Sequence, residues 1–199
     1  MPANGLINDT INLFREKFSH ANEKASPGYY EVALNNGIKA AFTTTERCGL
    51  HQYSFPKGAE PVIRFNLGFA INWDSPTETY IEKINDSTIV GYRFSKGWAH
   101  TQRLYFAART SVPFTKLYLA EGKVAVEGNN AKGKLTKGQL LFKNADGKTI
   151  FIKVSLSSVS TAKALLALDE IRGWNFNSVR KSAAAKWEKE LEKISIKSA

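Results

Sequence analysis

The sequence has little of what several functional classes require. It contains one cysteine, Cys48, among 199 residues, so no internal disulfide and no cysteine-based zinc site can form. Its three histidines, His20, His51 and His100, do not stand at a metal-ligand spacing. No apolar run reaches the roughly 18 residues of a membrane helix, and the longest, residues 162–171, includes three charged side chains. We therefore expect no membrane span and no metal or cofactor site in this chain.

Acidic residues are in the minority, and the first residues carry no secretory signal. The 28 Lys and Arg exceed the 18 Asp and Glu, for a net charge of +10, a balance that favours nucleic-acid binding when the charges are clustered. Here no more than two basic residues are adjacent, and the basic–aromatic signatures of RNA-binding sheets are missing. We expect a solvated, lysine-rich surface and no nucleic-acid partner.

Residues 1–4 lack the basic cluster and apolar stretch of an export signal.

Residues 27–159 have the pattern of short strands. Side chains alternate in residues 29–34 and again in 38–44, and the Asn-Gly pair between them supplies the positive φ angles of a tight hairpin turn. Further strands are predicted at residues 50–55, 62–65, 69–73, 79–84, 89–94, 104–108 and 115–119.

A second hairpin is predicted to join residues 139–142 to residues 149–152, and the Gly-, Asn- and Lys-rich stretch 122–138 is predicted to be a mobile loop. About ten short strands without intervening helices indicate an antiparallel sandwich or barrel. The fold class is therefore mainly β.

The last forty residues change to a helical period. A first helix is predicted over residues 161–171, with Ser160 or Thr161 as N-cap and Gly173 as its end. A second helix, over residues 179–192, opens at Asn177 or Ser178. Its apolar stripe has helical spacing and consists of Val179, Ala183, Trp187, Leu191 and Ile194.

Two acidic residues and the N-terminal segment leave open points. Asp169 and Glu170 lie near a helix C-terminus, where negative charge is unfavourable, so we predict an external partner, Arg172 or Arg180. Residues 8–10 could cap a short helix, but the spacing in residues 1–26 fits a helix only loosely. The predicted organisation is an N-terminal segment 1–26, a sandwich 27–159 and C-terminal helices 160–199.

A catalytic site is hard to find in the sequence. Cys48 and His51 do not make a nucleophile–base pair, because residues three apart on a strand point to opposite faces. Glycoside hydrolysis needs two carboxyl groups at a fixed separation, but each candidate is more simply a solvated carboxylate. These candidates are Glu31, Glu46, Asp74, Glu78, Glu82 and Asp86. We assign no catalytic residue.

Tryptophan is more informative, because an aromatic face can stack on the apolar side of a sugar ring. Trp98 lies next to Gly97 between two predicted strands, where a loop could present it, and Trp73 ends a predicted strand beside Asp74. Packing in the core or at an edge is the competing interpretation of either residue. Trp98 is the candidate carbohydrate-binding residue.

Three segments resemble motifs of glycoside hydrolase family 92. Residues 18–30 read FSHANEKASPGYY, similar to the family's FSHxNExAxPGYY, and residues 43–56 read TTTERCGLHQYSFP, similar to TxTERxGxHxYxFP. Residues 89–99, IVGYRFSKGWA, resemble GYRxSxGWA. Residues 154–159 and the two predicted helices are similar to the family's closing strand and helices, so the resemblance covers nearly all of residues 18–196.

The resemblance implies an N-terminal, antiparallel β-sandwich of the galactose-mutarotase (supersandwich) type with a C-terminal pair of helices. In that family the sandwich belongs to calcium-dependent, inverting exo-α-mannosidases that act on mannose-containing glycans. The general acid, the general base and the calcium ligands belong to an (α/α)-barrel domain that follows. A periplasmic, cell-surface or secreted parent is expected.

We expect this chain to be a fragment that is inactive alone. Its motifs end where the family's catalytic domain begins, and residues 1–17 do not match the family's glycine-rich opening strands. The alternative is a stand-alone carbohydrate-binding module in which Trp98 or Trp73 forms the sugar platform. Trp98 is carried over from the family only as a contributor at the domain interface.

Overall fold

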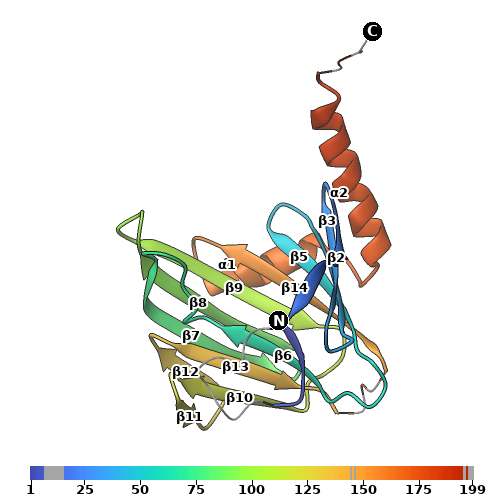
Figure 1. Ribbon diagram of the computed structural model, residues 1–199. Coiled ribbons are helices and arrows are strands. Elements are labelled where there is room, and N and C mark those ends of the chain that lie inside the picture. The colour runs from blue at the N-terminus through green and yellow to red at the C-terminus, as the bar shows by residue number, and fades with distance from the viewer. Residues whose placement is uncertain (7–15, 144, 146, 195, 197–199) are drawn as a thin grey trace.

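The chain forms two antiparallel sheets with two helices at its C-terminal end (Figure 1). The computed structural model describes residues 1–6, 16–143, 145, 147–194 and 196. The smaller sheet contains, in spatial order, β1 (Pro2–Asn4), β6 (Pro61–Asn66), β13 (Thr136–Leu141), β10 (Lys116–Glu121) and β11 (Val124–Val126). The larger sheet contains, in spatial order, β12 (Asn130–Gly133), β7 (Ser75–Asn85), β8 (Thr88–Lys96), β9 (Gln102–Thr110), β14 (Thr149–Ser157), β5 (Cys48–Ser54), β4 (Lys39–Thr44), β3 (Tyr29–Leu34) and β2 (Phe18–Ser26). The predicted antiparallel sandwich is confirmed.

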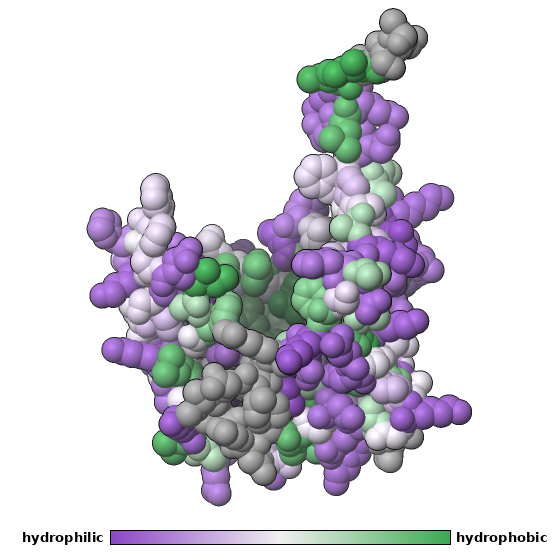
Figure 2. Space-filling view, in the orientation of Figure 1, coloured by the Kyte–Doolittle hydropathy of each residue, from purple (hydrophilic) through white to green (hydrophobic). Residues whose placement is uncertain are grey.

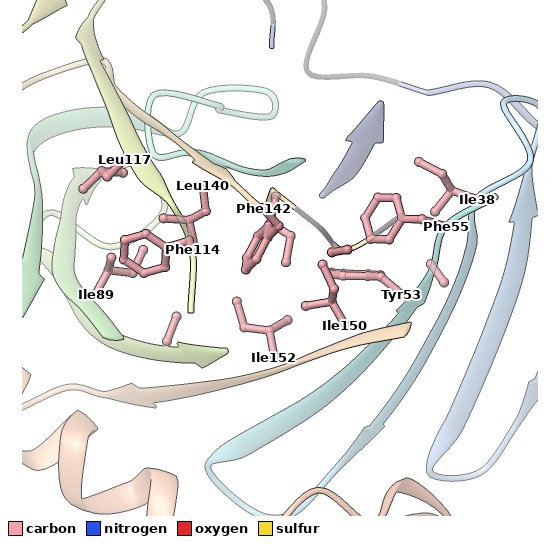
Figure 3. Close-up of a cluster of buried hydrophobic side chains, with 14 of the residues drawn as sticks. Ile38, Tyr53, Phe55, Ile89, Phe114, Leu117, Leu140, Phe142, Ile150 and Ile152 are labelled. Carbon is pink, nitrogen blue, oxygen red and sulfur yellow. The ribbon is translucent and has the colours of Figure 1, made fainter. Parts of the chain in front are cut away.

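The core lies between the two sheets (Figure 3). Strand β14 contributes Ile150 and Ile152 to it, and the smaller sheet contributes Leu117 and Leu140 from the opposite side. Phe114, only 2% exposed, fills the space beside them. Because alternate side chains of a strand face opposite sides, the same strands keep a second set of residues for the outer face of the larger sheet.

The helices cover that outer face and bury a second apolar cluster. Helix α1 (Thr161–Ala167) packs Ala164 against it, and the 3-10 turn η1 (Leu168–Glu170) adds Leu168. Helix α2 (Phe176–Leu191) adds Phe176 at its first turn. Cys48 lies in the same cluster with no exposed surface. The larger sheet is therefore buried on both faces near its middle.

The predicted helix bounds need correction. Ser160 is the N-cap of α1, as expected, and its Oγ accepts a hydrogen bond from the Lys163 amide at 3.2 Å. The α-helix ends at Ala167, four residues earlier than predicted, because the chain tightens into η1. Helix α2 begins at Phe176, where Asn175 Oδ1 caps the Ser178 amide at 3.0 Å.

The predicted β3–β4 hairpin forms, but with a three-residue turn. The Leu34 amide donates to the Ile38 carbonyl at 2.8 Å, and the Gly37 amide donates to the Leu34 carbonyl at 3.0 Å. Only Gly37 takes a positive φ, 82°, so the turn relies on glycine and not on both residues of the Asn-Gly pair. Asn36 instead closes the turn by accepting from the Ile38 amide at 3.1 Å.

Three predictions for other parts of the sandwich are wrong. Strand β13 lies in the smaller sheet and β14 in the larger, so the turn between them crosses between layers and makes no hairpin. A hairpin within one sheet and a crossing between two sheets can have the same turn residues and the same apolar alternation, so the sequence pattern does not distinguish them. Residues 122–138 hold β11, β12 and the start of β13. Residues 69–73 form a loop instead of a strand.

The predicted N-terminal segment contributes to both sheets. Strand β1 pairs with β6, and β2 pairs with β3. Residues 8–10, the predicted helix cap, lie outside the described residues. The division at residues 26 and 159 stays a prediction.

Candidate functional site

Two exposed tryptophans lie in neighbouring loops at one end of the larger sheet. Trp98 is 88% exposed in the turn between β8 and β9, and Trp73 is 67% exposed in the loop between β6 and β7. Gly97 brings the loops together, since a Cβ at Gly97 would lie 3.5 Å from Trp73 Cδ1 and 3.2 Å from the Cα of Asp74. Trp98 is therefore in a presenting loop, as predicted, while its role with a sugar stays a prediction.

Arg93 on β8 holds the β6–β7 loop in place. Its Nε donates to the Leu67 carbonyl at 3.0 Å, and its Nη2 donates to the Phe69 carbonyl at 3.1 Å. Nη2 also forms an ion pair with Asp74, and this hydrogen bond lowers the pKa of the Asp74 carboxyl. The guanidinium thus binds two carbonyls at the start of this loop, and residues 69–73 form no strand.

Sequence reasoning missed Arg93, although it stands inside the GYR motif. Its partners are 19 to 26 residues away in the chain, and no local pattern links them. Arginine is suited to the task, because its planar fork can donate to several acceptors at once. Arg93 thus attaches the loop that carries Trp73 to strand β8.

Most of the candidate carboxylates pair with cations. The pairs are Glu31 with Lys24 (3.8 Å), Glu46 with Lys186, Asp74 with Arg93, Glu78 with Lys132 (3.1 Å) and Asp86 with Lys83 (2.6 Å). Hydrogen bonds from Lys186 and from Tyr92 lower the pKa of Glu46 and of Glu78, respectively. A general acid for glycoside hydrolysis needs a raised pKa instead. These carboxylates fit structural ion pairs.

Cys48 and His51 are separated by the sheet, as predicted. The Cys48 thiol is buried under the helices, and burial raises its pKa to about 11. His51 contacts Tyr53, with Nδ1 2.9 Å from the phenol oxygen, and its ring lies edge-on to Phe42. Removal from water lowers the pKa of His51 to about 4. Neither group is set up as a nucleophile or its base.

Glu170 anchors the helical segment to the sheet. It accepts hydrogen bonds from Thr45 Oγ1 at 2.6 Å, from the Arg47 amide at 3.1 Å and from Arg47 Nε at 2.5 Å. The predicted partners Arg172 and Arg180 were wrong, since the cation comes from the turn before β5. Arg180 lies instead over the Tyr29 ring, 3.6 Å from its centroid. We call the Thr45–Arg47–Glu170 contacts the helix anchor.

Among the described residues, no group of three or more His, Cys, Asp and Glu side chains is placed to hold a metal ion. No described helix is both long and apolar enough to cross a membrane. The fold and the loop cluster define the class of the protein: a β-sandwich domain that displays fixed, exposed aromatic side chains at one end.

The chain belongs to glycosyl hydrolase family 92. Residues 1–157 match the family described as "Glycosyl hydrolase family 92 N-terminal domain". The match includes residues 1–17, for which the motif comparison expected no counterpart. It ends just before α1.

Relatives of known structure share the fold over nearly the whole chain. The family GH92 alpha-mannosidase BT3965 from Bacteroides thetaiotaomicron superposes with a TM-score of 0.92 at 30% identity, over 100% of this chain and 29% of its own. The inverting mannosidase BT2199 from the same organism has a TM-score of 0.85 at 20% identity, over 99% and 26%, and supports the fold alone.

A curated relative is also much longer than the part that matches this chain. An uncharacterized secreted glycosidase from Arthroderma benhamiae is 29% identical in an alignment that covers 88% of this chain and 26% of the relative. The chain therefore spans less than a third of the length of these relatives.

Proposed function

We propose that this chain is the sandwich portion of an α-mannosidase that hydrolyses terminal α-mannosides of glycans, and that it is inactive alone. The relatives that carry the name mannosidase are more than three times longer than the part matched here. The described carboxylates with shifted pKa values are all shifted downward, away from what a general acid needs. An acid, a base and an (α/α)-barrel to hold them would come from the following region.

The proposed chemistry is inverting hydrolysis. One carboxylic acid protonates the leaving oxygen while a second carboxylate activates water on the opposite face of the sugar. Among the described residues no group of three or more His, Cys, Asp and Glu side chains is placed to hold a metal ion, and we propose that the calcium ion of the parent enzyme is held by the region that follows. The sandwich would cover one side of the cleft and exclude water. The secreted relative supports an extracellular, cell-surface or periplasmic parent.

The exposure of Trp98 carries the proposal for this chain's own role. A side chain of that size that is 88% exposed, on a loop whose Gly97 lies against the loop of Trp73, offers its ring face to a partner. The apolar face of a mannose ring suits such a surface. We assign Trp98 to glycan contact at the domain interface.

The test is mannosidase activity of the native gene product that contains these residues. Trp98→Ala is expected to lower kcat/KM for an α-mannoside about fivefold, since an aromatic contact contributes on the order of 1 kcal/mol. Val124→Ala is the control, because Val124 is 69% exposed on β11 in the other sheet. Equal activity of both variants would remove Trp98 from the site.

A stand-alone carbohydrate-binding module is the second candidate, favoured by two exposed tryptophans in adjoining loops. Titration of the isolated 199-residue chain with methyl α-mannoside, followed by tryptophan fluorescence, separates the candidates. The binding module would be supported if the fluorescence change saturated at millimolar or lower methyl α-mannoside and if Trp98→Ala abolished this change. We expect no saturable change, because half of the proposed site lies on the following domain.

A further inference from the structure

Helix α2 packs on the sandwich with its first half only. Its 16 residues span about 24 Å, and in Figure 1 the helix rises away from both sheets toward the C-terminus. Phe176 and Ala183 are its buried residues. Ala183 lies so close to the backbone of Gly28 that a Cβ at Gly28 would be 2.7 Å from the Ala183 methyl group. Beyond that contact α2 has no buried residue, and Lys186 still reaches the sandwich through its exposed ion pair with Glu46.

An apolar stripe continues along the projecting half. Trp187, Leu191 and Ile194 follow Ala183 at intervals of four, four and three residues, so they extend the face that packs at Ala183. Their exposed fractions are 52%, 54% and 79%. Figure 2 shows apolar surface at the upper end of the same helix. We call Trp187, Leu191 and Ile194 the distal stripe.

Carboxylates border the end of this stripe. Glu188 and Glu192 line a shallow groove of about 550 Å³ together with Leu191, Ile194 and Ile196. Neither glutamate forms an ion pair with another residue that the structure describes. A complementary surface would insert apolar side chains into the groove and place a Lys or Arg at its border.

The extent of the relatives indicates where that surface comes from. The match is to an N-terminal domain that ends before α1, and about 70% of the BT3965 enzyme lies outside the part that is matched here. In such enzymes the polypeptide that follows α2 is therefore the nearest large partner. The distal stripe also continues a face that already packs within this chain, which favours an intramolecular partner.

We propose that the distal stripe is the docking surface for the catalytic region that follows in the same polypeptide, and that the contacting surface is apolar with a basic residue at its border. The proposal rests on the proposed function only in requiring a longer parent protein. It adds the residues through which the sandwich holds that region at a fixed angle.

Hydrogen exchange tests the proposal directly. The backbone amides of residues 184–191 are compared in the isolated 199-residue chain and in the native gene product, whose intact mass is measured first. We expect the amides to exchange at least tenfold more slowly in the native product, because packing of the stripe suppresses fraying. A native product of only 22.1 kDa would overturn the proposal.

Variants identify the surface responsible. Leu191→Ser is expected to abolish most of the protection in the native product while leaving the isolated chain's exchange unchanged. Glu188→Lys tests the basic border and is expected to reduce protection. Val124→Ser changes an apolar position on β11 that is 69% exposed, against 54% for Leu191; it is the control and is expected to have no effect.

The outcomes separate docking from the proposed function. Protection without mannosidase activity would support docking and remove the mannosidase. Activity without protection would overturn docking and keep the mannosidase. Protection that already exists in the isolated chain, together with a dimer that Leu191→Ser dissociates, would assign the stripe to a second copy and overturn the proposal.

Discussion

Gly91 is the position where the packing leaves least room for a side chain. A Cβ there would lie 2.0 Å from the Tyr80 carbonyl oxygen and 2.7 Å from the Phe106 ring. The first neighbour is backbone of the paired strand β7, which cannot move without breaking the ladder. The glycine of the GYR motif thus has a packing reason that is independent of catalysis.

Gly91→Ala is expected to lower the free energy of unfolding by about 2–3 kcal/mol, as overpacking in a core does. Gly49→Ala is the matched control on β5, since its nearest neighbour is a side chain, His51 at 3.3 Å, and not the backbone of a paired strand. Urea denaturation of both variants measures the difference. Equal losses would show that the sheet accommodates a methyl group at residue 91.

For single residues, the sequence predicted the local placement of a side chain better than its hydrogen-bond or ion-pair partner. It indicated that Trp98 lies in a loop and that Cys48 and His51 point apart, because both follow from neighbouring residues. It did not find Arg47 as the partner of Glu170, since 123 residues separate them. Pairings of that kind depend on the fold and have no local signature.

Among the elements, the helical segment from α1 to α2 has the most specific attachment. The helix anchor fixes the end of η1 through Glu170, and Lys153 Nζ donates to the Ile171 carbonyl at 2.6 Å one residue later. Lys153 also lies 4.4 Å from the Trp174 ring centroid. Together these contacts set the direction in which α2 leaves the sheet.

Glu170→Ala is expected to lower the free energy of unfolding by about 1 kcal/mol, because a charged acceptor of several hydrogen bonds is lost while Arg47 stays largely solvated. Hydrogen exchange in residues 168–176 should quicken. Glu190→Ala, which removes an exposed ion pair with Lys193, is expected to have almost no effect. If both variants behaved alike, the anchor would be an ordinary surface pair.

Strands were predictable where a short turn joins them to the next strand of the same sheet. The β3–β4 hairpin and most strands were predicted within a few residues, because alternation and turn residues lie in the same stretch of chain. The crossing from β13 to β14 was predicted as a hairpin, since the turn itself does not reveal which sheet each strand joins. Strands β11 and β12 were missed because Gly, Asn and Lys obscure their short alternation.

Across the whole molecule, the shifted acids and the buried histidine respond to pH in the same direction. Hydrogen bonds lower the pKa of Glu46, Asp74 and Glu78, so the folded chain binds fewer protons than the unfolded chain in acid. The pKa of His51 is lowered as well. The net charge of +10 adds repulsion as carboxylates are neutralised.

Stability should therefore fall in two steps as the solution is acidified. The pKa of His51 is 6.5 in the unfolded chain and about 4 in the folded one. Its contribution to the free energy of unfolding is therefore complete above pH 6.5 and is lost as the pH falls toward 4. That loss amounts to at most about 3.5 kcal/mol, at 1.4 kcal/mol for each pKa unit. The carboxylates follow at lower pH.

Urea denaturation between pH 4 and pH 7 measures the first step, and His51→Gln, which can still bond to Tyr53, should remove most of it. A variant that kept the full slope would place the titrating group elsewhere.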